Sequence, residues 1–320
     1  MEYRQLGNSE LRVSVVGLGG NTFGPPRLDE PASHRVIDAA LDLGINFVDT
    51  AHGYSEGLSE EFIGRALEGR RQRMLIATKF SLRDLGGMRA RERIHKVADE
   101  SLRRLRTDYV DLYQTHFPNP AVPPDEILRA LDDLVRAGKV REIGCCNYSS
   151  WRVAESVFTA RTLGTKSFIT AQNHYNLLRR RPEQEQLPFC EAYHLSFIPY
   201  FPLGGGFLTG KYRRGEPAPP GTRGAAGSPI VKWTSSERNW ALLADLEPFA
   251  REQGHTVLEL AIAWLIANET VGSVICGASN GEQVAMNVKA AEWQLTADVK
   301  QAADALAPPE TDNGPYETRG

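Results

Sequence analysis

The feature of this sequence that most constrains its fold is a repeated alternation of short β-branched segments with longer amphipathic segments. The short segments predict eight strands, at residues 15–18, 46–49, 75–79, 109–115, 142–145, 168–172, 196–200 and 273–276. Amphipathic segments between them predict helices at 34–43, 59–67, 89–105, 125–137, 150–161 and 182–193. Strands that alternate with helices form parallel sheets through crossover connections. Eight repeats predict a single (β/α)8 TIM barrel, since a doubly wound sheet usually has about five or six strands.

Residues that favour helix ends occur where the periodic segments begin and stop. Gly44, Gly138 and Gly164 follow predicted helices, at positions where a left-handed residue commonly ends a helix. Asp125 and Ser150 stand at the beginning of two others and are predicted N-caps. The residues that favour helix ends therefore occur where the periodic pattern predicts that helices begin and end.

Three segments fall outside the alternation. Residues 6–13 predict an N-terminal β-hairpin that turns at Gly7-Asn8 and closes the bottom of the barrel. Residues 203–233, rich in glycine and proline, predict a long loop after strand seven, and long loops in compact domains are often functional. The end from Pro308 onward is polar and predicts a loosely held tail.

The overall composition is that of an ordinary globular protein. The 320 residues are 41% hydrophobic and 24% charged, which is enough for a core without disulfides or metal, and we expect one domain over residues 1–320. A net charge of −3 argues against a nucleic-acid partner and favours a small-molecule substrate. No segment resembles a signal peptide or a membrane span, so we expect a cytoplasmic protein without a membrane partner.

The cysteines and histidines show no pattern typical of a redox or metal site. Cys145, Cys146, Cys190 and Cys276 lack C-x-x-C spacing, and we expect them to be buried, reduced thiols. The seven histidines do not cluster at ligand spacing. We therefore expect no metal.

Polar residues stand at the ends of three neighbouring predicted strands. Asp49 ends strand two in NFVDTA, Lys79 ends strand three in LIATKF, and His116 follows strand four in YVDLYQTH. Tyr54 lies on the loop after Asp49. In a TIM barrel the carboxyl ends of the strands and the loops after them form the active site, so these four side chains are expected to meet.

These residue types suit the reduction of a carbonyl group. A phenol is a poor acid at neutral pH, but a nearby ammonium lowers its pKa, and we expect Lys79 to act on Tyr54 in this way. Asp49 would hold Lys79 charged and in place. His116 could orient a substrate carbonyl oxygen while Tyr54 donates the proton.

A phosphate site is expected near strand eight. The glycines of the first strand do not complete a G-x-G-x-x-G motif, which argues against a Rossmann cofactor site. The segment 281–288, directly after strand eight, begins a predicted helix whose free N–H groups attract phosphate. Barrels commonly place phosphate at this position.

Eight segments carry a resemblance to a known family over nearly the whole chain. They are VVGLGGNTFG, GINFVDTAHGYSEGLSEEFIGRAL, IATKF, DLYQTHFPN, GKVREIGCCNYS, AQNHYNLL, PYFPLGGGFLTGKY and ICGASNGEQVAMNV. In this order they resemble the aldo-keto reductase family, in particular its branch with bacterial reductases and potassium channel β subunits. The resemblance implies a nicotinamide-dependent oxidoreductase that reduces aldehydes or ketones.

The resemblance also implies roles for individual residues. Asp49, Tyr54, Lys79 and His116 match the family's catalytic tetrad. The residues that would bind NADPH are Gly20, Asn21, Thr22, Asp49, Cys146, Asn147, Gln172, Tyr200, Leu203, Gly205, Lys211, Arg223, Gly277, Ser279, Gln283 and Asn287. Of these, Asn147 and Gln172 would hold the nicotinamide amide, Tyr200 would stack on its ring, and Arg223 would contact a phosphate. The substrate pocket would be formed by Phe23, Tyr54, Phe80, His116, Phe117 and Pro118.

Two positions depart from the family pattern. Cys146 stands where a serine is usual beside Asn147, and Met286 stands where a glutamate is common before Asn287. NADH therefore stays an alternative to NADPH.

A lysine Schiff-base enzyme and a non-catalytic nicotinamide-binding subunit also stay open as functions, although a carboxylate beside Lys79 opposes the low pKa that an amine nucleophile needs. The sequence leaves the substrate and a homo-oligomeric state undetermined.

Overall fold

The computed structural model describes residues 1–310 and contains a closed barrel of parallel strands. The barrel strands are β3 (Val16–Gly19), β4 (Phe47–Asp49), β5 (Leu75–Ser81), β6 (Val110–Phe117), β7 (Val140–Cys146), β8 (Phe168–His174), β9 (Ser196–Tyr200) and β10 (Val274–Gly277). They follow one another around the ring in chain order, and β10 pairs with β3 to close it. The predicted (β/α)8 barrel is confirmed, with every predicted strand placed to within a few residues.

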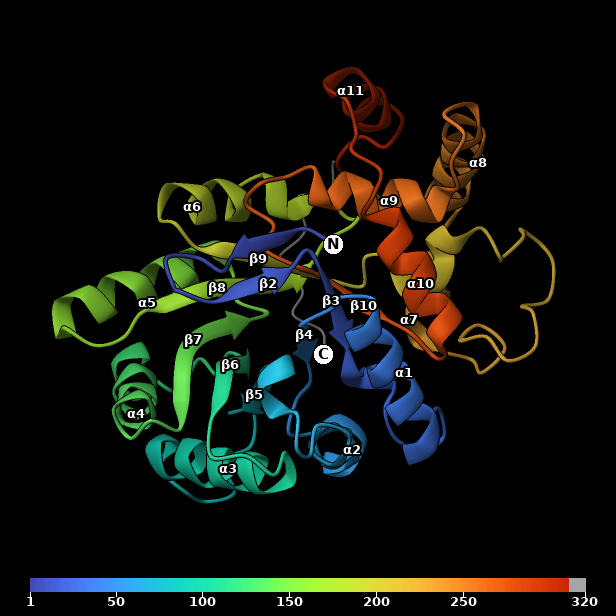
Figure 1. Cartoon of the computed structure of the whole chain (residues 1–320). Coiled ribbons are helices and arrows are strands. Elements are labelled where there is room, and N and C mark those ends of the chain that lie inside the picture. The colour runs from blue at the N-terminus through green and yellow to red at the C-terminus, as the bar shows by residue number, and fades with distance from the viewer. Residues whose placement is uncertain (311–320) are drawn as a thin grey trace.

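Helices surround this ring of strands (Figure 1). They are α1 (Glu30–Asp42), α2 (Leu58–Ala66), α3 (Ala90–Arg104), α4 (Pro124–Arg136), α5 (Ser150–Leu163), α6 (Gln186–Ala192), α9 (Val257–Ile266) and α10 (Gly281–Ala290). Further out lie α8 (Glu237–Glu252) and α11 (Ala297–Leu306), while α7 (Pro229–Thr234) belongs to the long loop after β9. Short 3-10 turns complete the elements: η1 (Gly20–Thr22), η2 (Tyr54–Gly57), η3 (Arg71–Arg73), η4 (Arg181–Glu183) and η5 (Gly204–Thr209). The helix predicted at 182–193 begins later, because its first residues belong to η4.

The predicted helix C-terminal glycines are confirmed, but both predicted N-caps are wrong. Positive φ angles occur at Gly44 (83°), Gly138 (73°) and Gly164 (66°). The N-cap of α4 is Pro123, so Asp125 lies in the first turn, where its charge still favours the helix dipole. The N-cap of α5 is Ser149, whose extended backbone precedes the helical Ser150.

An antiparallel hairpin of β1 (Tyr3–Gln5) and β2 (Arg12–Ser14) lies across the middle of the ring of strands (Figure 1). The prediction of a hairpin at residues 6–13 is confirmed in kind, although residues 6–11 form its turn and the strands flank it. Leu6, Leu11 and Val13 pack against apolar side chains inside the barrel. Gly7 has φ 56°, and a Cβ there would lie 2.4 Å from the carbonyl oxygen of Ile169. The hairpin thus plugs the amino-terminal end of the barrel.

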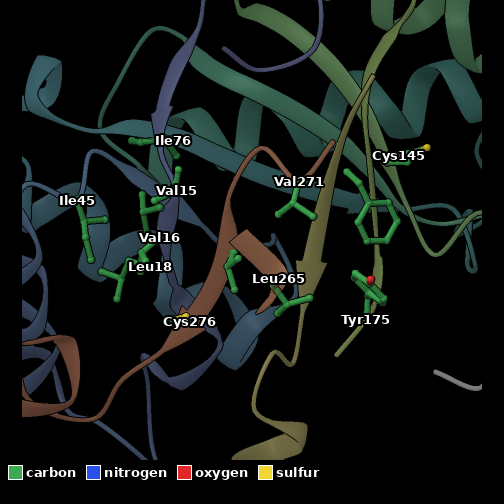
Figure 2. Close-up of a cluster of buried hydrophobic side chains, with 14 of the residues drawn as sticks. Val15, Val16, Leu18, Ile45, Ile76, Cys145, Tyr175, Leu265, Val271 and Cys276 are labelled. Atoms are coloured by element: carbon green, nitrogen blue, oxygen red, sulfur yellow. The ribbon is translucent and has the colours of Figure 1, made fainter. Parts of the chain in front are cut away.

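A large apolar layer packs between the strands and the surrounding helices. Figure 2 shows part of it: Val16 and Leu18 on β3 point toward Ile45, which follows α1. Alternation along the strand turns the neighbouring residues Gly17 and Gly19 to the other side. The four cysteines are buried and free, as predicted.

Inside the barrel, the strands change from apolar to polar as they run toward the carboxyl end. Phe47, Ala77 and Leu112 belong to the apolar cluster over the hairpin. Two residues further along the same three strands come Asp49, Lys79 and Gln114, all buried. Because side chains in a strand alternate with a period of two, these polar groups point into the barrel directly above the apolar layer.

The chain after the barrel is anchored on the outer helices as far as it is described. Arg238 donates a hydrogen bond to the carbonyl oxygen of Pro308 (2.7 Å), and the N–H of Arg180 donates to Glu310 (3.1 Å). The rest of the predicted tail, residues 311–320, lies outside the described residues. Within residues 1–310, no helix is both long and apolar enough to cross a membrane.

Candidate active site

A buried ion pair forms the base of the site. Lys79 Nζ donates to Asp49 Oδ2 at 2.6 Å and to the carbonyl oxygen of Thr50 at 2.9 Å. The other carboxylate oxygen, Asp49 Oδ1, accepts from Gln172 Nε2 at 2.9 Å and from Gln114 Nε2 at 3.4 Å. Both oxygens of Asp49 are therefore satisfied by groups from β5, β6 and β8. This network fixes the position of the Lys79 ammonium.

The Tyr54 ring lies over this pair, beside His116. Tyr54 begins η2 on the loop after β4, where Ser55 and Glu56 have φ of 47° and 57°. The ammonium of Lys79 lies 5.3 Å from the centre of the Tyr54 ring, and the ring of His116 meets it edge-on at 5.6 Å. The structure thus brings together the four residues that the sequence placed at neighbouring strand ends.

The pKa of Tyr54 is raised in the folded protein, whereas the sequence predicted that Lys79 would lower it. Burial raises the pKa of the Tyr54 phenol to about 12, and Lys79 acts in the opposite direction without cancelling this effect. Burial also lowers the pKa of Lys79, but Asp49 chiefly reverses this, so its net shift is upward. Tyr54 therefore keeps its proton and Lys79 its charge. A Schiff-base role, which needs a neutral amine, does not fit Lys79.

His116 is held as a neutral imidazole. Burial lowers its pKa to about 3, with smaller contributions from Lys79 and Arg83. Its ring stacks on Phe117 at 4.2 Å, and the guanidinium of Arg83 covers the Phe117 ring at 3.6 Å. Its carbonyl oxygen accepts from Asn147 Nδ2 at 2.9 Å. The imidazole is thus fixed between Tyr54 and Phe117, where it can donate one hydrogen bond.

Asn147 and Gln172 lie next to the tetrad with their amide nitrogens already bonded. Asn147, at a φ of 61°, also donates to Cys146 Sγ (3.3 Å), while its Oδ1 accepts from the hydroxyl of Tyr200 (2.7 Å). Gln172 Nε2 is bonded to Asp49, and its Oε1 lies 3.4 Å from Cys146 Sγ. Burial raises the pKa of Cys146 to about 12, so its thiol stays protonated. Each amide oxygen has a second lone pair for a ligand amide N–H.

A cavity of about 1960 Å³ opens above these residues at the carboxyl ends of the strands. Its volume exceeds the roughly 300–1,000 Å³ of a typical small-molecule pocket, so it can hold a dinucleotide with a second ligand. The predicted cofactor residues on its wall are Asn21, Thr22, Asp49, Cys146, Asn147, Gln172, Tyr200, Leu203, Gly205, Lys211, Arg223, Gly277, Ser279, Gln283 and Asn287. Tyr54, His116 and Phe117 line it as well.

One end of the cavity suits phosphate. Arg223 reaches from the long loop to β10, where its Nη2 lies 3.5 Å from the point that a Cβ on Gly277 would occupy. Burial lowers the pKa of Arg223 to about 10, with a smaller contribution from Arg27, which also lines the cavity. Within residues 1–310, no carboxylate lies within ion-pair distance of either guanidinium. The α10 helix starts beside them, capped by Asn280. The donor set therefore fits the phosphates of a nicotinamide dinucleotide.

Four predicted site residues do not line the cavity: Gly20, Phe23, Phe80 and Pro118. Gly20 faces α2, where its carbonyl oxygen accepts from Ser59 Oγ at 2.8 Å. Phe23 is fully buried in the outer apolar layer. Phe80 is fully buried too and packs on Tyr113 at 4.8 Å, because it follows the inward-pointing Lys79 and so points outward. The structure therefore does not bring these four residues to the cavity.

The sequence reasoning missed three residues of the site. Gln114 donates to Asp49, His174 lines the cavity beside Tyr200, and Arg27 lines it and acts on the charge of Arg223. The period of two along the strands could have identified the first two, since they follow Leu112 and Gln172 on the same face. Arg27 lies in a loop with no periodic signal. No group of three potential metal ligands occurs among residues 1–310.

The chain is similar to known proteins of one family. Residues 15–308 match the profile of the aldo/keto reductase family. The uncharacterized oxidoreductase YrpG of Bacillus subtilis is 33% identical, with 96% of both chains covered. The probable voltage-gated potassium channel subunit beta of Oryza sativa is 34% identical over 96% of both chains. The versiconal hemiacetal acetate reductase of Aspergillus parasiticus is 32% identical over 92% of this chain and 94% of its own.

Proposed function

Because the chain belongs to the aldo/keto reductase family, we propose that it reduces an aldehyde or ketone to an alcohol, with NADPH as the reductant. The observation that carries this proposal is the arrangement of Tyr54 and His116 over the buried Lys79–Asp49 pair. It joins a protonated phenol, a neutral imidazole and a fixed positive charge at one point of a large cavity.

The residues of the chain would supply the proton and the electrostatic environment for this reaction. Bound NADPH supplies the hydride that reaches the carbonyl carbon. Tyr54 donates its proton to the carbonyl oxygen as negative charge develops there. Lys79 stabilises the phenolate that remains, since its charge lies next to the ring and Asp49 prevents its loss.

His116 would position the carbonyl group. A neutral imidazole carries one N–H that can donate to the carbonyl oxygen without competing with Tyr54 as an acid. The low pKa of His116 keeps it in this form at every pH at which the protein is expected to work. Its stacking on Phe117 fixes the direction of the N–H.

Asn147, Gln172 and Tyr200 would orient the nicotinamide. The oxygens of Asn147 and Gln172 would accept from the N–H groups of a ligand amide, because their nitrogens are bonded within the protein. Tyr200 would stack on the ring. Lys211, Arg27 and Arg223 all line the cavity, and their positive charges favour a cofactor with more negative charge, which supports NADPH over NADH.

A panel of aldehydes, ketones and sugars, with the loss of NADPH absorbance as the readout, tests the proposal. We expect turnover of at least one carbonyl compound in the wild type and a large loss in Tyr54→Phe. Binding of NADPH without turnover of any carbonyl would favour a non-catalytic subunit; the rice relative is named a probable channel subunit. Trapping of a substrate adduct by borohydride without cofactor would instead support a Schiff-base enzyme.

A further inference from the structure

Three aromatic rings meet at the carboxyl ends of β8 and β9. His174 and Tyr200 are direct register partners on these strands, and their rings stack at 5.5 Å with an interplanar angle of 23°. Phe201 meets both rings edge-on, at 5.2 Å from Tyr200 and 5.6 Å from His174. All three residues line the cavity. The rings form one packed unit, named here the His174–Tyr200 stack.

Three contacts orient the plane of the Tyr200 ring. Its hydroxyl donates to Asn147 Oδ1 at 2.7 Å, which fixes one end of the ring. The His174 imidazole covers one face. Phe201 supports the edge while its backbone keeps a φ of 54°, a conformation that a residue with a side chain holds only where its surroundings impose it. The Tyr200 ring is therefore oriented before any ligand enters.

A side-chain amide determines where the proton of His174 lies. Asn176 Oδ1 accepts from the backbone N–H groups of Leu178 (2.9 Å) and Arg179 (3.1 Å), which identifies this atom as the oxygen. The nitrogen, Nδ2, donates to the carbonyl oxygen of Phe201 at 2.7 Å and lies 3.1 Å from His174 Nε2. Since Nδ2 can only donate, Nε2 must accept. The imidazole proton therefore lies on Nδ1, and the ring is neutral.

The surroundings of His174 oppose a second proton. Burial lowers its pKa to about 3, and the nearby guanidinium of Arg179 acts in the same direction. Protonation of Nε2 would also set its N–H against the N–H of Asn176. Hydrogen bonding, burial and charge thus all favour one neutral tautomer.

We propose that His174 is a positioning residue for the nicotinamide, which holds Tyr200 in the plane on which that ring stacks and adds no positive charge beside it. This inference rests on the proposed function. Loss of a hydride leaves a nicotinamide ring positively charged, so a cation next to it would disfavour the oxidised cofactor. A neutral imidazole gives the packing of an aromatic ring without that repulsion.

Cofactor titration of three variants tests the role. His174→Ala removes the stack, and we expect NADPH and NADP+ to bind about 2- to 10-fold more weakly, the range for one aromatic pair. His174→Phe keeps a neutral ring and should bind both nearly as the wild type does. His174→Lys places a cation there and should weaken NADP+ more than NADPH. A matched control is Phe158→Ala, which removes an aromatic pair with Tyr193 on the outside of the barrel and should change neither affinity.

Equal losses in His174→Ala and His174→Phe, or no loss in His174→Ala, would overturn the positioning role. Equal weakening of both cofactor forms in His174→Lys would overturn the argument from charge.

The proton position can be measured separately in the protein without cofactor. In 15N-detected NMR of the wild type, we expect the His174 ring to show a protonated Nδ1 and a bare Nε2 between pH 8 and pH 5. An imidazolium signal at pH 6 would contradict the inference. If the tautomer is as expected but the wild type binds neither NADPH nor NADP+, the proposed function fails and the positioning role fails with it.

Discussion

Lys79 Nζ lies 2.6 Å from Asp49 Oδ2, and neither side chain reaches solvent to any useful extent. The pair is isolated from water by the apolar layer beneath it and by Tyr54 above. A charge in such a place is stable only with its partner. The same contact therefore serves both the stability of the barrel and the chemistry proposed for the site.

Replacement of Lys79 by methionine should affect stability and activity together. The change leaves Asp49 buried without its partner, and breaking a buried pair in this way costs about 3–5 kcal/mol. We expect a lower free energy of unfolding in urea and loss of carbonyl reduction. In the double variant Lys79→Met/Asp49→Asn, stability should recover in part while activity stays absent. Full activity in Lys79→Met would show that the tetrad is wrongly assigned.

Tyr54→Phe should separate catalysis from cofactor binding. The phenyl ring keeps its contact with His116, but the proton donor is lost. Positioned acid catalysis contributes about 10²- to 10⁴-fold, so kcat should fall by this factor, or roughly 3–5 kcal/mol in activation free energy. The Kd for NADPH should stay close to wild type in a fluorescence titration. A variant within a few-fold of wild-type kcat, with chemistry limiting turnover, would exclude Tyr54 as the donor and leave His116 as the next candidate.

Arg223→Ala should weaken NADPH more than NADH. The guanidinium of the half-buried Arg223 lies at the end of β10, within the field of Arg27, and the additional phosphate of NADPH would offset its charge. The two Kd values can be compared by titration. Arg214→Ala on the same loop is a matched control, because Arg214 is exposed and paired with Glu237. Equal weakening of both cofactors would show that Arg223 does not recognise that phosphate.

The stability of the protein should fall as the pH drops below about 6.5. His116 and His174 each have a pKa of about 3 in the folded protein, whereas an unfolded histidine titrates near 6.5. Between these values the unfolded chain binds protons that the folded chain excludes, so acid favours unfolding. Urea unfolding between pH 7.5 and pH 4.5 measures this. His174→Phe should show a shallower decline, and an unchanged decline would mean that His174 is protonated when folded.

The sequence predicted the barrel well because its periodic pattern repeats in every strand and helix unit. The same pattern predicted the tetrad, since Asp49 and Lys79 each end an apolar run abruptly. Gln114 was missed because it lies inside its strand, where position along the inward face matters more than the end of a run. Phe80 was misplaced because closeness in sequence to a site residue does not imply the same face of the strand.

The degree of burial of the charged and titratable side chains could not be predicted from the sequence. The charges around Tyr54 were predicted correctly, but the direction of its net pKa shift depends on desolvation, which outweighs Lys79. The same holds for Arg223. Its residue type indicates charge, whereas only the fold shows that burial and the charge of Arg27 both act on its guanidinium.

The hairpin of β1 and β2 closes the amino-terminal end of the barrel. Because Leu6, Leu11 and Val13 fill that end, ligands enter and leave the described part of the barrel on the side of the cavity at the carboxyl ends of the strands. Two ligands that share this cavity therefore have to bind and dissociate one after the other. If the nicotinamide stacks on Tyr200 at the base of the cavity, the carbonyl compound arrives after it and the alcohol departs before it. The seal at the far end would thereby impose a first-in, last-out order on turnover.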